Sequence, residues 1–210
     1  MKLKFEPNQQ YQLNAIDAVV DIFRGQQNIT NGVSIPGQLP LGIEGQQLSL
    51  ETAGARGNNL LLSEDQVIRN TRLVQERNSI LPAETAGRAI VTNHRSTDVV
   101  YGEKFLCGMN FSIEMETGTG KTYVYLRTIH ELHEQYGWKK FIIVVPSVAI
   151  REGVLKNLEI TREHFDELYH KPAMNPYVWD SKKTGQAREF ATNDTLQIMV
   201  ITIDSFAKAA

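Results

Sequence analysis

The sequence has little of several features, and each scarcity excludes a class of protein. Its 210 residues include one cysteine, Cys107, which excludes an intrachain disulfide and a zinc site built from cysteines. The longest purely apolar run is Phe141–Val145, five residues, whereas a membrane-spanning helix needs ~20. The first residues contain no apolar stretch of the kind found in secretory signals. We therefore expect a cytoplasmic protein that makes no contact with a membrane.

An excess of positive charge is also missing. The 22 Lys and Arg residues stand against 24 Asp and Glu residues, so the formal net charge is −2. Any contact with nucleic acid must therefore be local rather than spread over the whole surface. The hydrophobic fraction of 41% and the charged fraction of 22% are those of an ordinary globular chain. At ~150 residues per domain, the length allows one domain or slightly more.

The amino-terminal part of the chain contains two predicted helices separated by a glycine-rich stretch. Apolar residues recur at helical spacing up to Gly25, which predicts a helix over residues 9–24. Seven of the fifteen glycines fall within residues 25–63, so this stretch is expected to be rich in loops, with one short hairpin near 41–52. A capping-box pattern beginning at Ser63 then predicts a helix over 64–77.

From residue 110 the pattern becomes that of an α/β protein. Alternating apolar and polar residues predict a strand over 110–116, and the apolar run 141–145 predicts a second strand that Pro146 ends. A third strand is expected over 196–203. Helices are expected at about 121–136, 148–158 and 162–170. Alternating strands and helices predict a parallel sheet with helices on its faces. We divide the chain into an amino-terminal helix (1–24), a loop-rich insertion with one helix (25–104) and an α/β region (105–210).

Glycines and a lysine between the first predicted strand and its helix predict a phosphate-binding loop. Residues 115–122 read Met-Glu-Thr-Gly-Thr-Gly-Lys-Thr, which is the Walker A pattern with methionine at the position of its first glycine. Gly118 and Gly120 let the backbone turn so that N–H groups face a phosphate, and the helix that follows adds the positive end of its dipole. Lys121 can reach the β- and γ-phosphates, and the Thr122 hydroxyl can bind Mg²⁺. The alternative is a glycine-rich turn without a ligand, but the Gly-Lys-Thr triplet and both flanking elements favour the phosphate loop.

A glutamine at the start of the first helix is a candidate to recognise a base. The side-chain amide of Gln12 offers one donor and one acceptor, which matches one edge of adenine. Phe5 and Tyr11 are candidates to stack on that base. A solvated glutamine at a helix start is the plainer explanation, and only the presence of a phosphate loop in the same chain makes the two interpretations comparable.

Three stretches of the chain are specific enough to compare with known families. They are Tyr-Gln-x-x-Ala-Ile around Gln12, Glu-Met-Glu-Thr-Gly-Thr-Gly-Lys-Thr-Tyr-Val at 114–124, and Phe-Ile-Ile-Val-Val-Pro-Ser-Val-Ala-Ile-Arg-Glu-Gly-Val at 141–154. They resemble superfamily 2 helicase-like ATPases, and more narrowly the Res subunit of bacterial type III restriction–modification enzymes. The segment 197–206 is similar to that family as well. The resemblance implies a partial RecA-like P-loop NTPase domain with a parallel sheet and flanking helices, in addition to the loop-rich insertion.

The resemblance also implies cofactors and site residues. ATP and Mg²⁺ would be bound, and Gln12 would read adenine. The residues that hold the phosphates would be Thr117, Gly118, Thr119, Gly120 and Lys121. Lys121 and Thr122 would serve hydrolysis, and Thr122 would bind Mg²⁺. Two segments at strand ends would contact the DNA backbone through Ser147, Arg151, Asp204 and Ser205. Ligands of open parallel sheets sit at these carboxyl ends, although Ser147 as a plain helix cap and Arg151 as an ordinary surface charge remain open alternatives.

The same resemblance implies a function and partners for a longer protein. It implies the ATP-binding segment of an ATP-dependent DNA translocase and endonuclease, with double-stranded DNA as substrate and a methyltransferase (Mod) subunit as partner. The acidic pair that hydrolysis needs at a strand end is not found, because Asp166-Glu167 lies in a polar helical stretch. We therefore expect an amino-terminal piece that is inactive alone. The alternatives are another superfamily 2 translocase without a nuclease, a P-loop kinase or nucleotide switch, and a non-catalytic remnant.

Overall fold

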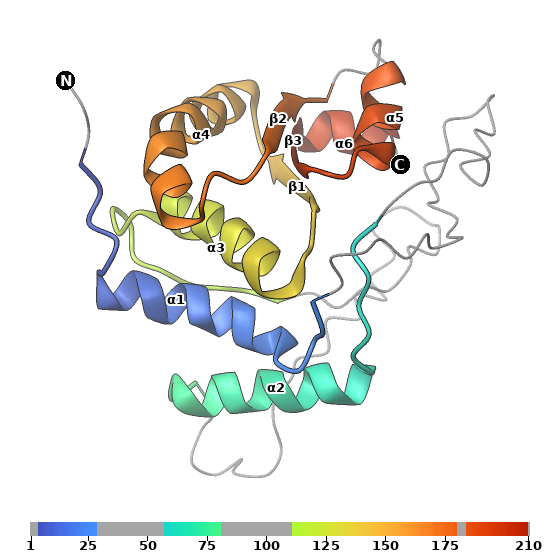
Figure 1. Cartoon of the computed structure of the whole chain (residues 1–210). Coiled ribbons are helices and arrows are strands. Elements are labelled where there is room, and N and C mark those ends of the chain that lie inside the picture. Colours follow the sequence, from blue (N-terminus) through green and yellow to red (C-terminus); the bar gives the residue numbers. More distant parts are fainter. Residues whose placement is uncertain (1–3, 29–56, 81–110, 180–183, 210) are drawn as a thin grey trace. The chain divides into compact units, whose positions relative to one another are not determined.

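The structure, a computed structural model, describes residues 4–28, 57–80, 111–179 and 184–209 (Figure 1). These residues form two compact units. The unit that we call the sheet unit holds residues 4–7, 27–28, 57–61, 122–179 and 184–209. The unit that we call the helical unit holds residues 8–26, 62–80 and 111–121. The hairpin predicted near 41–52 lies outside the described residues.

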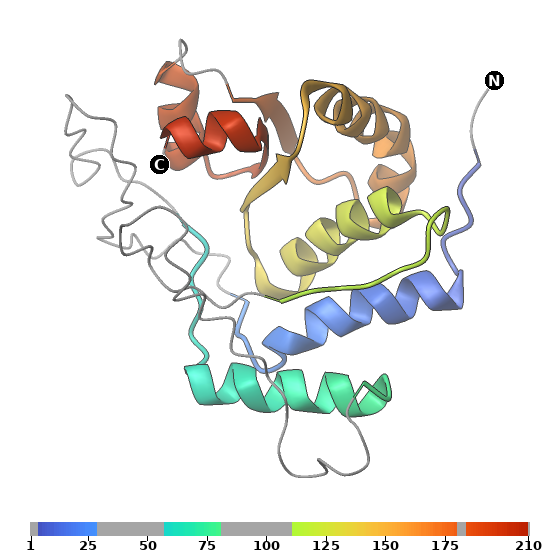
Figure 2. The ribbon, with the colours of Figure 1, turned by 180° about the vertical axis from the view of Figure 1, so that it is seen from behind.

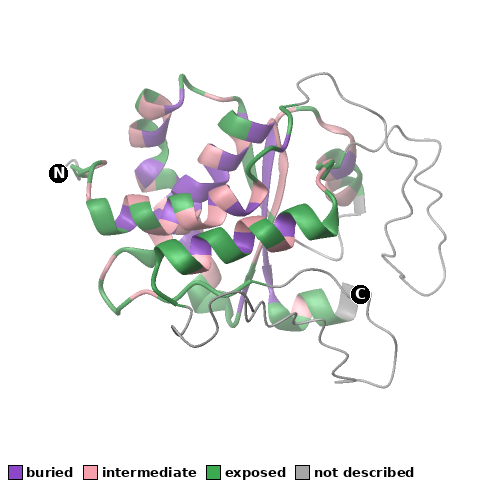
Figure 3. Ribbon diagram, turned by 90° about the horizontal axis from the view of Figure 1, so that it is seen from below, coloured by how far each residue is buried: buried purple, intermediate pink, exposed green. Residues whose placement is uncertain are grey.

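The sheet unit is built on three parallel strands, which confirms the predicted α/β class. The strands β1 (Lys140–Val145), β2 (Met174–Val178) and β3 (Leu196–Thr202) lie in the order β1-β3-β2. The central strand β3 is buried at every position, and Figure 3 shows this burial along the strand. A strand covered on both faces needs a nearly continuous apolar run, and residues 196–202 provide one.

Helices cover both faces of this sheet. Helices α3 (Lys121–Tyr136) and α4 (Val148–Leu168) lie on one face, and α5 (Thr184–Thr192) and α6 (Ile203–Ala209) lie on the other (Figures 1 and 2). The core between the first pair and the sheet consists of Tyr123, Leu126, Ile129, Val145, Val154, Leu158, Phe165, Tyr169, Met174, Leu196, Ile198 and Val200. No helix among the described residues is long and apolar enough to cross a membrane.

Several of the elements predicted from residue 110 onward were wrong. Residues 111–116 do not form a strand, because none of the described strands pairs with them and a strand needs a partner for its backbone groups. The break expected near residue 160 is absent, and α4 continues through it as a single helix. Strand β2 and helix α5 were not predicted. Pro176 lies within β2, which tolerates it because β2 is at the edge of the sheet.

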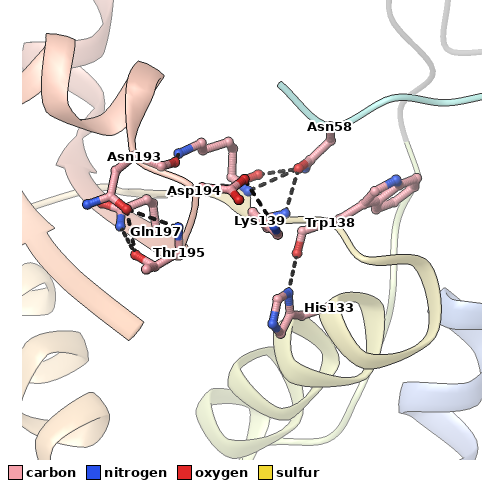
Figure 4. A network of polar contacts seen from close by, with 9 residues as sticks. Asn58, His133, Trp138, Lys139, Asn193, Asp194, Thr195 and Gln197 are labelled. Atoms are coloured by element: carbon pink, nitrogen blue, oxygen red, sulfur yellow. Dashed lines mark hydrogen bonds and ion pairs between the residues drawn. The ribbon is translucent and has the colours of Figure 1, made fainter. Parts of the chain in front are cut away.

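A polar network ties residues 58–59 to the start of β1 (Figure 4). The Asn58 side-chain oxygen accepts hydrogen bonds from the backbone N–H groups of Lys139 and Lys140, at 2.8 and 3.0 Å. Its side-chain nitrogen donates to the carbonyl oxygen of Lys140 at 2.7 Å. The Trp138 indole donates to the carbonyl oxygen of Asn59 at 3.2 Å. One asparagine side chain thus takes the place of a neighbouring strand at the beginning of β1.

The helical unit contains α1 (Gln10–Val20), the short 3₁₀ helix η1 (Asp21–Phe23) and α2 (Glu64–Arg77), which confirms both predicted helices. The capping box is present: Gln66 N–H donates to the Ser63 hydroxyl at 3.3 Å, and Ser63 N–H donates to the Gln66 side chain at 2.8 Å. Asn70 of α2 donates to the carbonyl oxygens of Ile22 and Arg24, at 3.1 and 2.9 Å. These bonds join α2 to the carboxyl end of η1.

Candidate nucleotide-binding site

The residues predicted to hold phosphate form an exposed and sharply curved loop in the helical unit. Gly118 and Gly120 have φ angles of +84° and +83°, which L side chains rarely adopt. A Cβ added at Gly118 would meet no atom within 4 Å, so the space beside this residue is open. Thr117 is exposed as well. The two glycines are therefore required by the backbone path, and the position beside Gly118 is open.

The side chains of the loop converge on one backbone carbonyl. The Thr119 hydroxyl donates to the carbonyl oxygen of Glu116 at 2.7 Å, and the Lys121 ammonium donates to the same oxygen at 2.6 Å. The lysine is thus held against its own loop instead of extending away from it. A phosphate oxygen is a stronger acceptor than a carbonyl, because the hydrogen bond then joins two charged groups. The loop residues therefore fit a phosphate ligand.

Gln12 is directly connected to this loop. Its side chain is buried, with 7% of the residue exposed, and its amide nitrogen donates to the carbonyl oxygen of Thr119 at 3.0 Å. The same nitrogen lies 3.4 Å from the hydroxyl of Tyr11, which is 49% exposed. The structure thus brings the predicted base-reading residue and the predicted phosphate loop together in the helical unit.

Of the two aromatic residues considered for base stacking, Phe5 is already engaged elsewhere. Its ring stacks on Tyr123 in the sheet unit, with centroids 5.8 Å apart and an interplanar angle of 16°. Tyr11 is exposed, and its hydroxyl donates to the Gln9 side chain. Tyr11 is therefore the better candidate to stack on a base.

Thr122, the predicted Mg²⁺ ligand, is half-buried in the first turn of α3 and belongs to the sheet unit. Burial raises the pKa of the neighbouring Tyr125, and the Thr122 side chain partly opposes the rise. A threonine hydroxyl supplies one oxygen ligand of the kind that Mg²⁺ binds.

The two segments that carry the four residues predicted to contact DNA begin at one edge of the sheet. Val145 and Thr202 are partners in the register, so the carboxyl ends of β1 and β3 coincide. Ser147 follows β1 and caps α4, where its hydroxyl accepts from the N–H of Ile150 at 3.3 Å. Asp204 and Ser205 follow β3 in the first turn of α6. The Ser205 hydroxyl accepts from the Thr202 hydroxyl at 2.9 Å.

The charged side chains described at this edge, one arginine and two carboxylates, do not make it basic. The Arg151 guanidinium donates twice to one Glu152 carboxylate oxygen, from Nε at 3.1 Å and from Nη2 at 2.8 Å. The Asp204 carboxylate is exposed. Four exposed apolar residues lie on the same two segments: Val148, Ile150, Ile203 and Phe206. A phosphate approaching this edge would therefore compete with Glu152 for Arg151.

One cluster was missed at the sequence level. Arg127 of α3 is buried, and its guanidinium contacts Tyr123, Tyr169, Glu131 and the carbonyl oxygen of Pro7. The available signal was the spacing, because Tyr123, Arg127 and Glu131 are four residues apart on one helix face. A charged residue in register with core positions indicates a buried polar contact.

Comparisons with known proteins give a consistent result. The family model described as "Type III restriction enzyme, res subunit" matches residues 64–210. The chain is 42% identical over 84 residues to the type III restriction-modification enzyme StyLTI Res subunit of Salmonella typhimurium, which is 39% of this chain and 8% of that protein. It is 33% identical over 153 residues to the EcoP15I Res subunit of Escherichia coli, which is 72% of this chain and 13% of that protein. It is 30% identical over 209 residues to the EcoPI Res subunit of Escherichia phage P1, which is 98% of this chain and 17% of that protein. The chain thus spans less than a fifth of the length of each of these relatives.

Proposed function

This chain belongs to the family of type III restriction enzyme Res subunits, and we propose that it binds ATP and Mg²⁺ through the loop at residues 115–122. The observation that supports this proposal is the conformation of the loop. Its glycines have positive φ angles, its lysine is held on a loop carbonyl, and a buried glutamine is hydrogen-bonded to it. These are the features that a loop needs in order to surround a phosphate with donors.

Each residue of the proposed site has one role. The backbone N–H groups of Thr117, Gly118, Thr119 and Gly120 donate to phosphate oxygens, and Lys121 exchanges the Glu116 carbonyl for the β- and γ-phosphates. Gln12 reads the edge of adenine. The Thr122 hydroxyl is a ligand of Mg²⁺, which when bound neutralises charge on the phosphates. Lys121 and Thr122 thereby serve ATP hydrolysis in the full-length protein.

We further propose that the chain is the nucleotide-binding segment of an ATP-dependent DNA translocase and endonuclease in the cytoplasm. The printed names of the relatives, which are Res subunits of type III restriction-modification enzymes, support this assignment. Double-stranded DNA is its substrate, and a methyltransferase (Mod) subunit is its partner. Ser147, Arg151, Asp204 and Ser205 contact the DNA backbone at the shared strand edge.

The test is a calorimetric titration of the chain with ATP and MgCl₂, comparing Lys121→Ala with the parent. We expect at least about tenfold weaker binding, because a hydrogen bond to a charged group contributes about 1.5–3 kcal/mol. The matched control is Lys156→Ala, which removes an exposed lysine of α4 that pairs only with Glu159 in the described contacts. Equal affinity of Lys121→Ala and the parent would refute the phosphate assignment.

A further inference from the structure

The two outer strands of the sheet, β1 and β2, have edges of different kinds. Strand β3 lies between them, so each has one side that faces β3 and one side that no described strand covers. Successive residues of a strand point their backbone N–H and C=O groups to opposite sides, so every second residue of an outer strand presents these groups to the uncovered side. The residues at those outward positions decide whether a further strand can pair there.

The outer side of β2 is closed by a proline. The carbonyl oxygen of Ala173 accepts a hydrogen bond from β3 at 3.1 Å, and the N–H of Trp179 donates to β3 at 3.1 Å. Odd-numbered residues of this strand therefore face β3, and Pro176 faces outward. Pro176 is exposed, and it lacks the N–H that a neighbouring strand would need at this position. Proline on an exposed edge protects a sheet from unwanted pairing.

The outer side of β1 begins with a hydrogen-bonded position. The carbonyl oxygen of Lys139 accepts from the N–H of Gln197 at 2.7 Å, so odd-numbered residues of β1 face β3. Lys140 faces outward, where its N–H and its carbonyl oxygen both bond to the Asn58 side chain, at 3.0 and 2.7 Å. The backbone of β1 thus pairs on its outer side as soon as a donor and an acceptor are held beside it.

The next two outward residues, Ile142 and Val144, are open. Within the described part of the chain, their backbone N–H and C=O groups have no hydrogen bond. Their side chains are exposed, with 49% and 43% of each residue accessible. Phe141 and Ile143 pack against the core beneath α3 and α4, so Ile142 and Val144 project from the opposite face. Neither outward residue is charged or a proline, so this edge lacks the protection of β2 and has the composition of a strand inside a sheet.

We propose that the outer side of β1 binds a further β-strand, parallel to β1 and hydrogen-bonded at Ile142 and Val144, which the full-length Res subunit supplies from outside residues 1–210. The same protein is the source because its relatives are much longer: the chain matches the EcoPI Res subunit over 98% of its own length but 17% of that protein. The strand is parallel because β1, β2 and β3 are parallel, and sheets of one kind are favoured over mixed ones. This inference does not depend on nucleotide binding.

Hydrogen exchange at single amides tests the assignment. In the 210-residue chain, the N–H groups of Ile142 and Val144 should exchange at least about tenfold faster than that of Ile143, which faces β3. In the full-length protein, the two outward amides should slow to the rate of Ile143. Both samples are measured without nucleotide, by NMR for the short chain and by mass spectrometry with electron-transfer fragmentation for the full-length protein.

A proline variant provides the second test. Val144→Pro removes an outward N–H, as Pro176 does in β2. It should leave the fast exchange of Ile142 unchanged in the 210-residue chain and accelerate Ile142 at least about tenfold in the full-length protein, because the added strand is lost. The matched control is Val178→Pro, at an outward position of β2, which should leave Ile142 unchanged in both proteins.

The competing occupants give different results, and each would overturn the proposal. Equally fast exchange of Ile142 and Val144 in both proteins would mean that no strand covers β1. Slow exchange in the 210-residue chain, at a concentration where ultracentrifugation shows a monomer, would mean that the chain covers its own edge. Slow exchange that appears only as this chain dimerises would assign the edge to a second copy. Slow Ile142 exchange retained in full-length Val144→Pro would exclude pairing at Val144, and if that variant does not fold, the two unsubstituted proteins decide.

Discussion

Replacing His130 with phenylalanine should make the sheet unit less sensitive to acid. His130 is 2% exposed in α3, and its ring stacks on Tyr169 with centroids 5.1 Å apart and an interplanar angle of 11°. Its Nδ1 has no hydrogen-bond partner among the described residues. Burial, with a smaller contribution from His133, lowers the pKa of His130 to about 4. The folded protein therefore holds this ring neutral under conditions in which an unfolded chain would protonate it.

The size of the change in unfolding free energy follows from the pKa of His130 in the folded and in the unfolded chain. Because the folded pKa of about 4 lies below the ordinary 6.5, the unfolded chain binds the proton more readily, and stability falls as the pH falls. The contribution of His130 is fully present above pH 6.5 and is lost as the pH decreases toward 4. Between pH 7.5 and pH 5.0 the parent should lose about 2 kcal/mol of unfolding free energy through this residue alone. His130→Phe should not show this component, and it also removes an unpaired buried nitrogen.

The assay is urea unfolding followed by tryptophan fluorescence at pH 7.5 and pH 5.0. Both tryptophans of the chain, Trp138 and Trp179, lie in the sheet unit, so the signal reports the unit that contains His130. The quantity compared is the difference in unfolding free energy between the two pH values. The control is His170→Asn at an exposed position, where the φ angle of +56° suits asparagine. If the parent and His130→Phe lose the same free energy between pH 7.5 and pH 5.0, the reasoning from burial is refuted.

Two further predictions concern the sheet unit. Asn58→Ala should lower its unfolding free energy by about 1–3 kcal/mol, because the backbone groups of Lys139 and Lys140 lose a partner, and amide exchange at these residues should accelerate. Unfolding free energy and amide exchange equal to those of the unsubstituted chain would contradict the role of the Asn58 side chain. Arg151→Gln should weaken binding of duplex DNA and reduce the slope of log affinity against log salt by about one, as measured by fluorescence anisotropy. Arg162→Gln, at an exposed position of the same helix, should keep the parent slope; equal slopes in all three proteins would remove Arg151 from the DNA contact.

Local signals in the sequence were sufficient for some elements. Helix α2 was predicted with its bounds because the Ser63 capping box defines a helix start by itself. The turn at Gly118 and Gly120 was predicted for a similar reason, since glycine supplies the positive φ angles that the loop contains. Strand β1 was recognisable because five consecutive apolar residues end at a proline. In each case the information lies within a few neighbouring residues.

Elements that depend on distant partners were not predictable in this way. Residues 111–116 alternate as a strand does, yet Phe111 and Ile113 are 42% and 49% exposed and no described strand pairs with them. Strand β2 contains a proline and no clear alternation, and it is a strand because β3 offers it a ladder of backbone groups. The Gln12–Thr119 hydrogen bond joins residues 107 positions apart. No pattern within either segment specifies that contact.

Helix α3 shows how a sequence can indicate such contacts indirectly. Nine of its residues are buried, spread over more than one face: Tyr123, Val124, Leu126, Arg127, Thr128, Ile129, His130, Leu132 and Tyr136. A helix buried on several sides is usually apolar throughout, because buried polar groups need partners. Among the buried polar positions, Arg127 contacts another segment by donating to the Pro7 carbonyl, whereas the Thr128 hydroxyl donates to the Val124 carbonyl of the same helix at 2.8 Å. Arg127 at a core position of α3 therefore indicates a second segment, and the structure identifies that segment as residues 5–7.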